Sequence, residues 1–146
     1  RIGDHFLDIS SQRHGAIVHL PALGIICGGN FGSDSLVPAL AADSDGSDEL
    51  ETLRLLARLV KHKLGVYIPH VGTETADKMA VMERLAADVA YLHGLKRVVT
   101  PLALRGENVE AIADLSESVL PRDRRTPPSM AVHQSNVTAL IQAARH

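Results

Sequence analysis

A chain of 146 residues with 45% apolar and 22% charged residues has the size and composition of one globular domain. Its net charge of −2 and aromatic content of 3% exclude the basic, aromatic-rich surfaces typical of nucleic-acid-binding proteins. The single cysteine, Cys27, excludes an internal disulfide, and no apolar run reaches the ~20 residues of a membrane helix. We therefore expect a soluble, cytoplasmic protein without nucleic-acid or membrane partners. Because the chain starts at Arg1 without a methionine, we also expect it to be a piece of a longer protein.

Short apolar runs separated by glycine and proline predict a β-rich first section that ends near Gly29. Residues 5–9 alternate between two faces, and residues 16–20 and 24–27 form two further runs on either side of a proline-containing turn. The sequence therefore predicts a strand, a loop and a tight hairpin.

After Gly29 the apolar spacing becomes that of helices, with one strand between them. Asp48 is a suitable N-cap for a helix with an apolar stripe, and Thr73 is a suitable N-cap for a longer one. The segment 121–128, rich in proline and arginine, is expected to be the most mobile linker. In chain order we expect helices at 33–42, 48–63 and 73–91, a strand at 65–69 between the last two, and helices at 108–119 and 132–144.

The order of these pieces resembles the C-terminal half of a metallo-β-lactamase-fold protein. The resemblance rests on the glycine-opened run GAIVHLP at 15–21, the hairpin into IICGGN at 25–30, a helix, a strand ending at Pro69, and a turn with His70 and Gly72. It covers residues 5–100, and residues 101–146 would form a helical tail. It implies that residues 1–146 form one α/β (α+β) domain, half of an αββα sandwich, with strands first and helices after them.

Proteins of that family hold two metal ions, often zinc, at one edge of the sandwich. In that family the second half of the fold supplies, in chain order, a histidine, a bridging aspartate and a second histidine. If the resemblance is aligned without a gap, these three positions are Gln12, Asn30 and Val71 in this chain. In this register no second-half ligand remains, so the resemblance implies a degenerate metal site, no bound cofactor and no catalytic residue in this chain. Asn30 then has a structural role, because asparagine tolerates the backbone geometry of a turn.

A register shifted by one or two residues would instead bring His14, Asn30 and His70 together as metal ligands. Asp34 would be a substitute carboxylate nearby. An amide oxygen is a weak neutral ligand, so this set would hold at most one zinc or other divalent ion.

Two functions follow from the resemblance. In the first, the chain is a structural or binding module with a degenerate metal site. In the second, it is the C-terminal half of a metal-dependent hydrolase of esters, thioesters, amides or phosphoesters, with its remaining ligands upstream of Arg1. Half of a sandwich would expose an apolar sheet face, which we expect to be covered by a second copy in a homodimer or by the missing N-terminal half. We expect Leu7, Ile9, Ile17, Ile25 and Ile26 to line that face.

Overall fold

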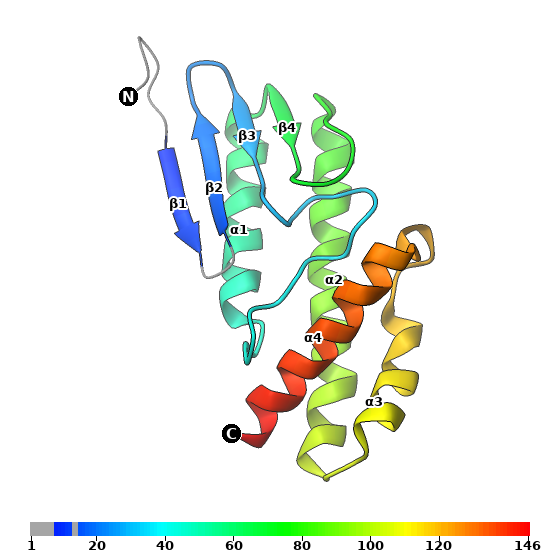
Figure 1. Cartoon of the computed structure of the whole chain (residues 1–146). Helices are drawn as coiled ribbons and strands as arrows, with labels where there is room; N and C mark the ends of the chain where they lie inside the picture. The colour runs from blue at the N-terminus through cyan, green and yellow to red at the C-terminus, as the bar shows by residue number, and fades with distance from the viewer. Residues whose placement is uncertain (1–7, 13–14) are drawn as a thin grey trace.

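The structure is a computed structural model that describes residues 8–12 and 15–146 of the chain (Figure 1). It confirms the mixed α+β class: a small sheet lies against a larger set of helices. The predictions for Leu7 and His14 fall outside the described residues. The elements are β1 (Asp8–Gln12), β2 (Gly15–Leu20), β3 (Ile25–Cys27), α1 (Ser47–Lys63), β4 (Val66–Ile68), α2 (Lys78–Leu104), α3 (Val109–Ser116), the 3₁₀ turns η1 (Glu117–Val119) and η2 (Arg122–Arg124), and α4 (Pro127–Arg145).

The four described strands form one sheet in the order β1-β2-β3-β4. The first three pair antiparallel as consecutive strands, which confirms the predicted hairpin. β4 pairs parallel to β3, with Ile26 opposite Tyr67. A parallel neighbour needs a crossover connection, and here the crossover contains α1.

The two faces of the sheet differ in burial. Ile17, His19, Ile26 and Tyr67 are buried, and α1 and α2 lie on one side of the strands in Figure 1. The alternate positions of β2, β3 and β4 are also apolar but remain partly exposed, and Ile68 is 40% exposed. These partly exposed residues are Val18, Leu20, Ile25, Cys27, Val66 and Ile68.

Our expectation that Ile17, Ile25 and Ile26 line one open face is wrong for two of them. Successive side chains of a strand point to opposite faces, so Ile25 and Ile26 cannot share one. Ile17 and Ile26 are 3% and 0% exposed and belong to the core, whereas Ile25 lies on the partly exposed face. The side chain of Ile9 is outside the described part of the chain.

The helix at 48–63 is confirmed, and it begins one residue earlier than predicted, at Ser47. Its predicted apolar stripe is buried: Leu50, Leu53, Leu56 and Val60 are all 8% exposed or less. Asp48 lies within the first turn, and the N-cap is Gly46, which has no side-chain cap.

The second long helix differs from its prediction at both ends. Asp77, rather than Thr73, is the N-cap of α2, and its carboxylate accepts bonds from the amides of Met79 and Ala80. The residues before Asp77 extend the sheet edge instead, because Thr75 and Tyr67 exchange two backbone hydrogen bonds. α2 continues past Tyr91 to Leu104, and Met79 in its first turn is 69% exposed.

The apolar stripe of α2 explains its length. Leu85, Leu92, Leu95 and Val99 are all buried at helical spacing, so the packing that stabilises the helix extends well beyond Tyr91. α2 packs against α1, α3 and α4 and forms the centre of the helical layer.

The predicted helix at 33–42 is wrong, because this segment is irregular and extended. Pro38 removes one backbone donor, and partners distant in sequence compete for others. The amide of Val37 donates to Ser129 Oγ at 3.2 Å, and the amide of Leu40 donates to Asn136 Oδ1 at 2.8 Å.

The C-terminal region is helical, as predicted. α3 begins after an Asn108 N-cap and continues into η1, which together match the predicted span 108–119. α4 begins at Pro127, five residues before the predicted start at 132, because Thr126 caps it and proline is tolerated in a first helical turn. None of the described helices has the length and apolarity that crossing a membrane requires.

Candidate functional site

The candidate site lies where β3 and β4 end side by side. The hydrogen bonding of these parallel strands continues into the turns that follow them. The amide of Gly28 donates to the carbonyl of Ile68 at 3.0 Å, and the amide of His70 donates to the carbonyl of Gly29 at 2.9 Å. The turn after Cys27 and the turn after Ile68 are therefore neighbours, at the carboxyl ends of parallel strands where α/β proteins commonly place ligands.

A cavity of about 40 Å³ opens between these turns and the irregular segment. Asn30 and Val71 line it from the two turns, and Val132 lines it from α4. Ligand pockets for drug-sized molecules are roughly 300–1,000 Å³, so this cavity accepts only a group the size of a few atoms. The remaining lining residues are Gly29, Ser33, Leu36, Val37 and Ala39.

Tyr67 of β4 is hydrogen bonded to the first turn, the one that follows Cys27. Its buried hydroxyl donates to the carbonyl of Phe31 at 2.7 Å. A β-carbon on residue 28 would lie 1.6 Å from the same hydroxyl, so only glycine fits there. Burial also raises the pKa of Tyr67 well above its ordinary value, so the phenol keeps the proton that it donates.

Asp34 connects the two turns at the surface. Its carboxylate accepts a bond from the amide of Thr73 at 2.9 Å and pairs with Arg84 at 3.7 Å. Arg84 also donates to the carbonyl of Thr73 at 2.7 Å. Burial alone would raise the pKa of Asp34, but the bonds from Thr73 and the charge of Arg84 outweigh it and keep that pKa below its usual value.

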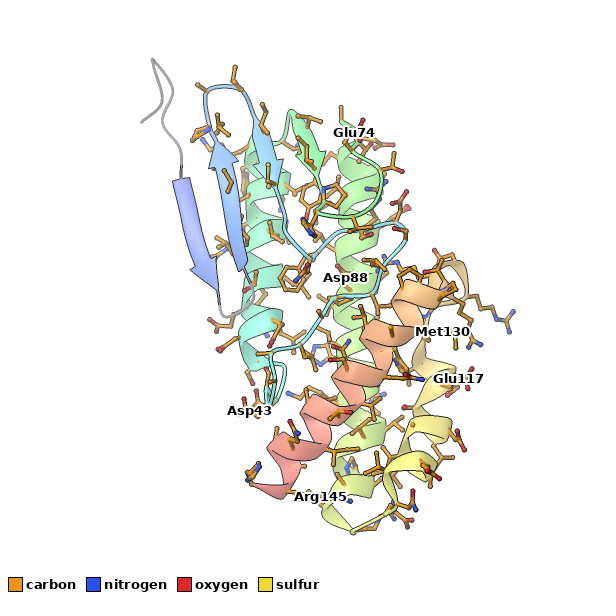
Figure 2. The ribbon with its side chains drawn as sticks, in the orientation of Figure 1. Asp43, Glu74, Asp88, Glu117, Met130 and Arg145 are labelled. Carbon is orange, nitrogen blue, oxygen red and sulfur yellow. The ribbon has the colours of Figure 1, made fainter. Side chains whose placement is uncertain are left out.

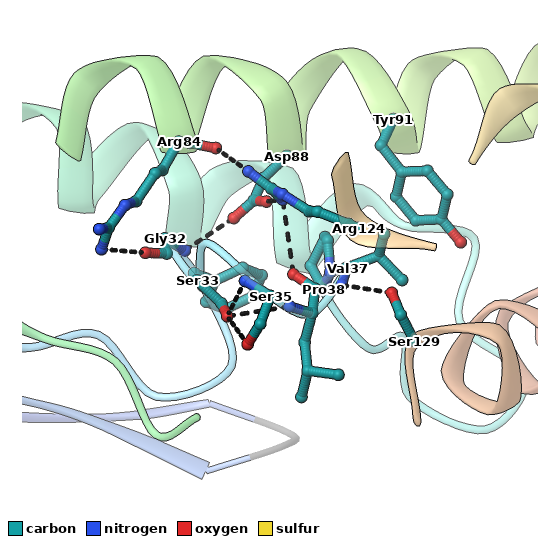
Figure 3. A network of polar contacts seen from close by, with 12 residues as sticks. Gly32, Ser33, Ser35, Val37, Pro38, Arg84, Asp88, Tyr91, Arg124 and Ser129 are labelled. Atoms are coloured by element: carbon teal, nitrogen blue, oxygen red, sulfur yellow. Dashed lines mark hydrogen bonds and ion pairs between the residues drawn. The ribbon is translucent and has the colours of Figure 1, made fainter. Parts of the chain in front are cut away.

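Beneath the irregular segment lies a buried ion pair between Asp88 of α2 and Arg124 of η2 (Figure 3). Their side chains are 1% and 3% exposed. The other carboxylate oxygen of Asp88 accepts the amide of Gly32 at 2.7 Å, and Arg124 also donates to the carbonyls of Leu36 and Arg84 at 3.5 and 3.3 Å. Figure 2 shows Asp88 within the body of the molecule, whereas Glu74 and Arg145 lie near its opposite ends.

Burial is the dominant influence on Asp88. It raises the pKa of this carboxyl to about 6, against the opposing effects of the Arg124 charge and the Gly32 amide. The ion pair therefore connects the first turn, α2 and η2 through the carboxyl of Asp88, whose pKa is about 6.

A second buried group fixes the far end of the irregular segment. Asn136 of α4 accepts the amide of Leu40, and its own amide donates to the carbonyl of Pro38 at 2.8 Å and to Tyr91 Oη at 3.1 Å. Tyr91 Oη lies 2.8 Å from His133 Nδ1, and burial lowers the pKa of His133. His133 and Asn136 are 5% and 0% exposed, so both side chains belong to the packed interior of the helical layer.

The structure brings Asn30 and Val71 together, as lining residues of one cavity. It places Gln12 in β1, opposite Gly15. His70 is exposed in the second turn, and His14 lies outside the described residues. The shifted set of His14, Asn30 and His70 therefore stays a prediction.

The lining of the cavity does not fit a divalent metal ion. Its side chains offer one neutral amide and one hydroxyl among aliphatic groups, whereas zinc is bound by imidazole, thiolate and carboxylate. Across residues 8–12 and 15–146, no three histidine, cysteine, aspartate or glutamate residues are grouped in a way that would hold a metal.

Sequence reasoning missed Asp88 and Arg124. Asp88 lies three residues after Leu85 and four before Leu92, so a carboxylate stands in the middle of the apolar stripe of a helix. A charge at such a position needs a partner, which is the signal that was available for this pair.

No family model matches the chain, and no curated protein matches it either.

Proposed function

We propose that this chain is a metallo-β-lactamase-like module with a degenerate metal site, which serves as a structural or binding domain rather than as a catalyst. The observation that carries the proposal is the shared cavity of Asn30 and Val71. The resemblance assigns metal ligands to these two positions, so their meeting at the carboxyl ends of β3 and β4 supports the ungapped register.

The side chains at these positions are chemically unsuited to a pair of metal ions. A bridging carboxylate offsets the charge of two close dications, but the amide of Asn30 is neutral. Val71 has no lone pair to replace an imidazole. Without such ligands no metal-bound hydroxide forms for attack on a carbonyl or phosphoryl group, so the cavity is better suited to a small neutral or apolar group.

The arrangement of the elements supports the proposed half-sandwich. An antiparallel hairpin leads into a parallel β3-α1-β4 crossover. Helices cover one sheet face (Figure 1), and the other face carries apolar side chains that are at least partly exposed. Strands that are apolar on both faces are typical of sheets buried on both sides. We propose that a second copy of the chain covers this face in a homodimer; the alternative is an N-terminal half on a separate polypeptide.

The alternative function is the C-terminal half of a metal-dependent hydrolase that takes its remaining ligands from upstream of Arg1. The hydrogen bonds that fix the first turn favour this alternative. Tyr67 and Asp88 hold residues 28–32 in a fixed geometry, as a ligand-bearing turn requires. A retained geometry is equally useful to a module that binds a partner through the same turn.

Metal analysis of the purified chain separates the two functions. After incubation with zinc and exhaustive dialysis, we expect far less than one zinc per chain by inductively coupled plasma mass spectrometry. One tightly held zinc, lost in His14→Ala or His70→Ala but kept in His62→Ala, would contradict the proposal and support the shifted register. His62 is a suitable control because it is exposed in the last turn of α1, away from both turns.

A further inference from the structure

We propose that residues 120–126, which we call the strap, are a latch for residues 28–41, which we call the pocket loop. In this proposal Arg124 holds the pocket loop closed, and strap and loop open together as one unit that uncovers the cavity beside Asn30. The inference does not depend on the proposed function, because it concerns only how the wall of the cavity is held in place.

Arg124 is the structural centre of the latch. Its guanidinium reaches the carbonyl of Leu36 in the pocket loop, and it also pairs with Asp88 and donates to the carbonyl of Arg84 in α2 (Figure 3). Leu36 itself lines the cavity. One side chain of the strap therefore connects the wall of the cavity to the central helix.

Apart from Arg124 and the core residue Leu120, few side chains of the strap are buried. Leu120 and Arg124 are buried, whereas Arg122, Asp123 and Arg125 are exposed. The bonds of Arg125 go to nearby carbonyls at 3.4 Å, within the strap and η1. A segment with two buried side chains belongs to the low-stability end of a protein, where local opening is least costly.

The pocket loop depends on side chains of the helices rather than on a backbone ladder. The amides of Gly32, Val37 and Leu40 donate to Asp88, Ser129 and Asn136 respectively. Ser129 lies in the first turn of α4, directly after the strap. The strap and the start of α4 thus hold the adjacent cavity residues Leu36 and Val37.

The buried charge makes the two openings interdependent. If the strap lifts, Arg124 leaves the site and Asp88 is left as a buried carboxylate with the amide of Gly32. An unpaired buried charge is strongly unfavourable, so Asp88 must then take up a proton or be reached by water. Asp88 is hydrated most directly when Gly32 and the pocket loop move away from it, so opening of the strap favours opening of the loop.

Native-state hydrogen exchange tests this on the unmodified chain. Exchange of the amides of Gly32, Val37, Leu40 and Arg124 is measured by NMR at increasing low concentrations of denaturant. We expect the opening free energies of these four amides to converge on one value, as they would for a single opening reaction. This open state should be at least tenfold more populated than the state that exposes the α2 core, which the amide of Leu95 reports. Independent openings, or exchange only through global unfolding, would overturn the proposal.

Two variants test the role of Arg124 itself. Arg124→Gln should accelerate exchange of Gly32 and Val37 at least tenfold more than exchange of Leu95. Arg122→Gln removes an exposed charge from the same 3₁₀ turn and should leave all of these rates within about twofold. If Arg124→Gln does not fold, Arg124→Lys replaces it, because lysine keeps the charge but lacks the guanidinium. Equal protection of the Gly32 and Val37 amides in Arg124→Lys and in the unmodified chain would contradict a latch that depends on the guanidinium.

Discussion

The phenol oxygen of Tyr67 lies 1.6 Å from the point that a β-carbon on Gly28 would occupy. The absence of that carbon lets the hydroxyl reach the carbonyl of Phe31, which holds the turn bearing Asn30. Position 28 and the ring of Tyr67 are therefore a matched pair, and the turn between β3 and the pocket loop depends on both.

Gly28→Ala should lower the free energy of unfolding by about 1–3 kcal/mol, the usual cost of inserting a carbon into a packed site. Urea denaturation measures the loss. In a Tyr67→Leu background the ring and hydroxyl are gone, so the added cost of Gly28→Ala should be much smaller. Equal costs in both backgrounds would show that the two positions do not interact.

Asp88→Asn should change how stability depends on pH. Burial raises the pKa of Asp88 to about 6, above its ordinary value of 3.8, so the folded chain binds a proton more readily than the unfolded chain. The contribution of Asp88 to the free energy of unfolding is then greatest below pH 3.8 and is lost as the pH rises through about 6. Denaturation at pH 4, 5, 6 and 7 should show the unmodified chain losing stability relative to Asp88→Asn as the pH rises, and the opposite trend would show that Arg124 dominates this carboxyl.

His133→Gln should reveal the opposite dependence. Burial lowers the pKa of His133, so the folded chain binds a proton less readily there than the unfolded chain. Its contribution is present above the ordinary value of 6.5 and declines as the pH falls below it. The unmodified chain should therefore lose stability relative to His133→Gln between pH 7 and 5, measured in the same denaturation series.

The sequence predicted local structure well where periodicity and burial agree. The stripe of α1 is buried as expected, and β3 and β4 lie where short apolar runs end in turns. Asn30 and Val71 line one cavity because each follows one of two adjacent strands by a few residues.

The errors arise where distant contacts override local preference. Residues 33–42 have helical spacing, but the amides of Val37 and Leu40 bond to Ser129 and Asn136, more than 90 positions away. The segment 121–128 has the composition of a mobile linker, and that composition gave no sign that Arg124 within it is buried against Asp88. Partners so far apart in the chain leave no local pattern that one sequence reveals.

Asn30→Asp restores the carboxylate that the resemblance assigns to the turn. We expect no metal-dependent rise in melting temperature, because Val71 still offers no ligand. Adding Val71→His supplies an imidazole on the same cavity, and this double variant should show the larger response to zinc of the two. A ligand at a hundredfold excess over its dissociation constant stabilises the folded state by about 2.7 kcal/mol. A zinc-dependent stabilisation of that size in Asn30→Asp alone would contradict our expectation that this variant does not bind the metal.

The partly exposed sheet face predicts that the chain pairs with itself. Val18, Leu20, Ile25, Val66 and Ile68 offer aliphatic side chains to solvent on the face away from the helices, and apolar patches of this kind mark contact surfaces. A two-fold pair needs only one self-complementary surface. Size exclusion with light scattering should therefore give about twice the chain mass of 15.7 kDa.

Ile68→Lys should return the chain to a monomer, because a paired face would bury an uncompensated charge. Leu104→Lys is the matched control: Leu104 is 67% exposed at the end of α2, away from the sheet, and its change should leave the mass unaltered. Mass spectrometry of the same peak distinguishes a second copy from a different polypeptide, which would support a separate N-terminal half. A 15.7 kDa species that persists at high concentration would contradict pairing and require the face to be covered within the chain.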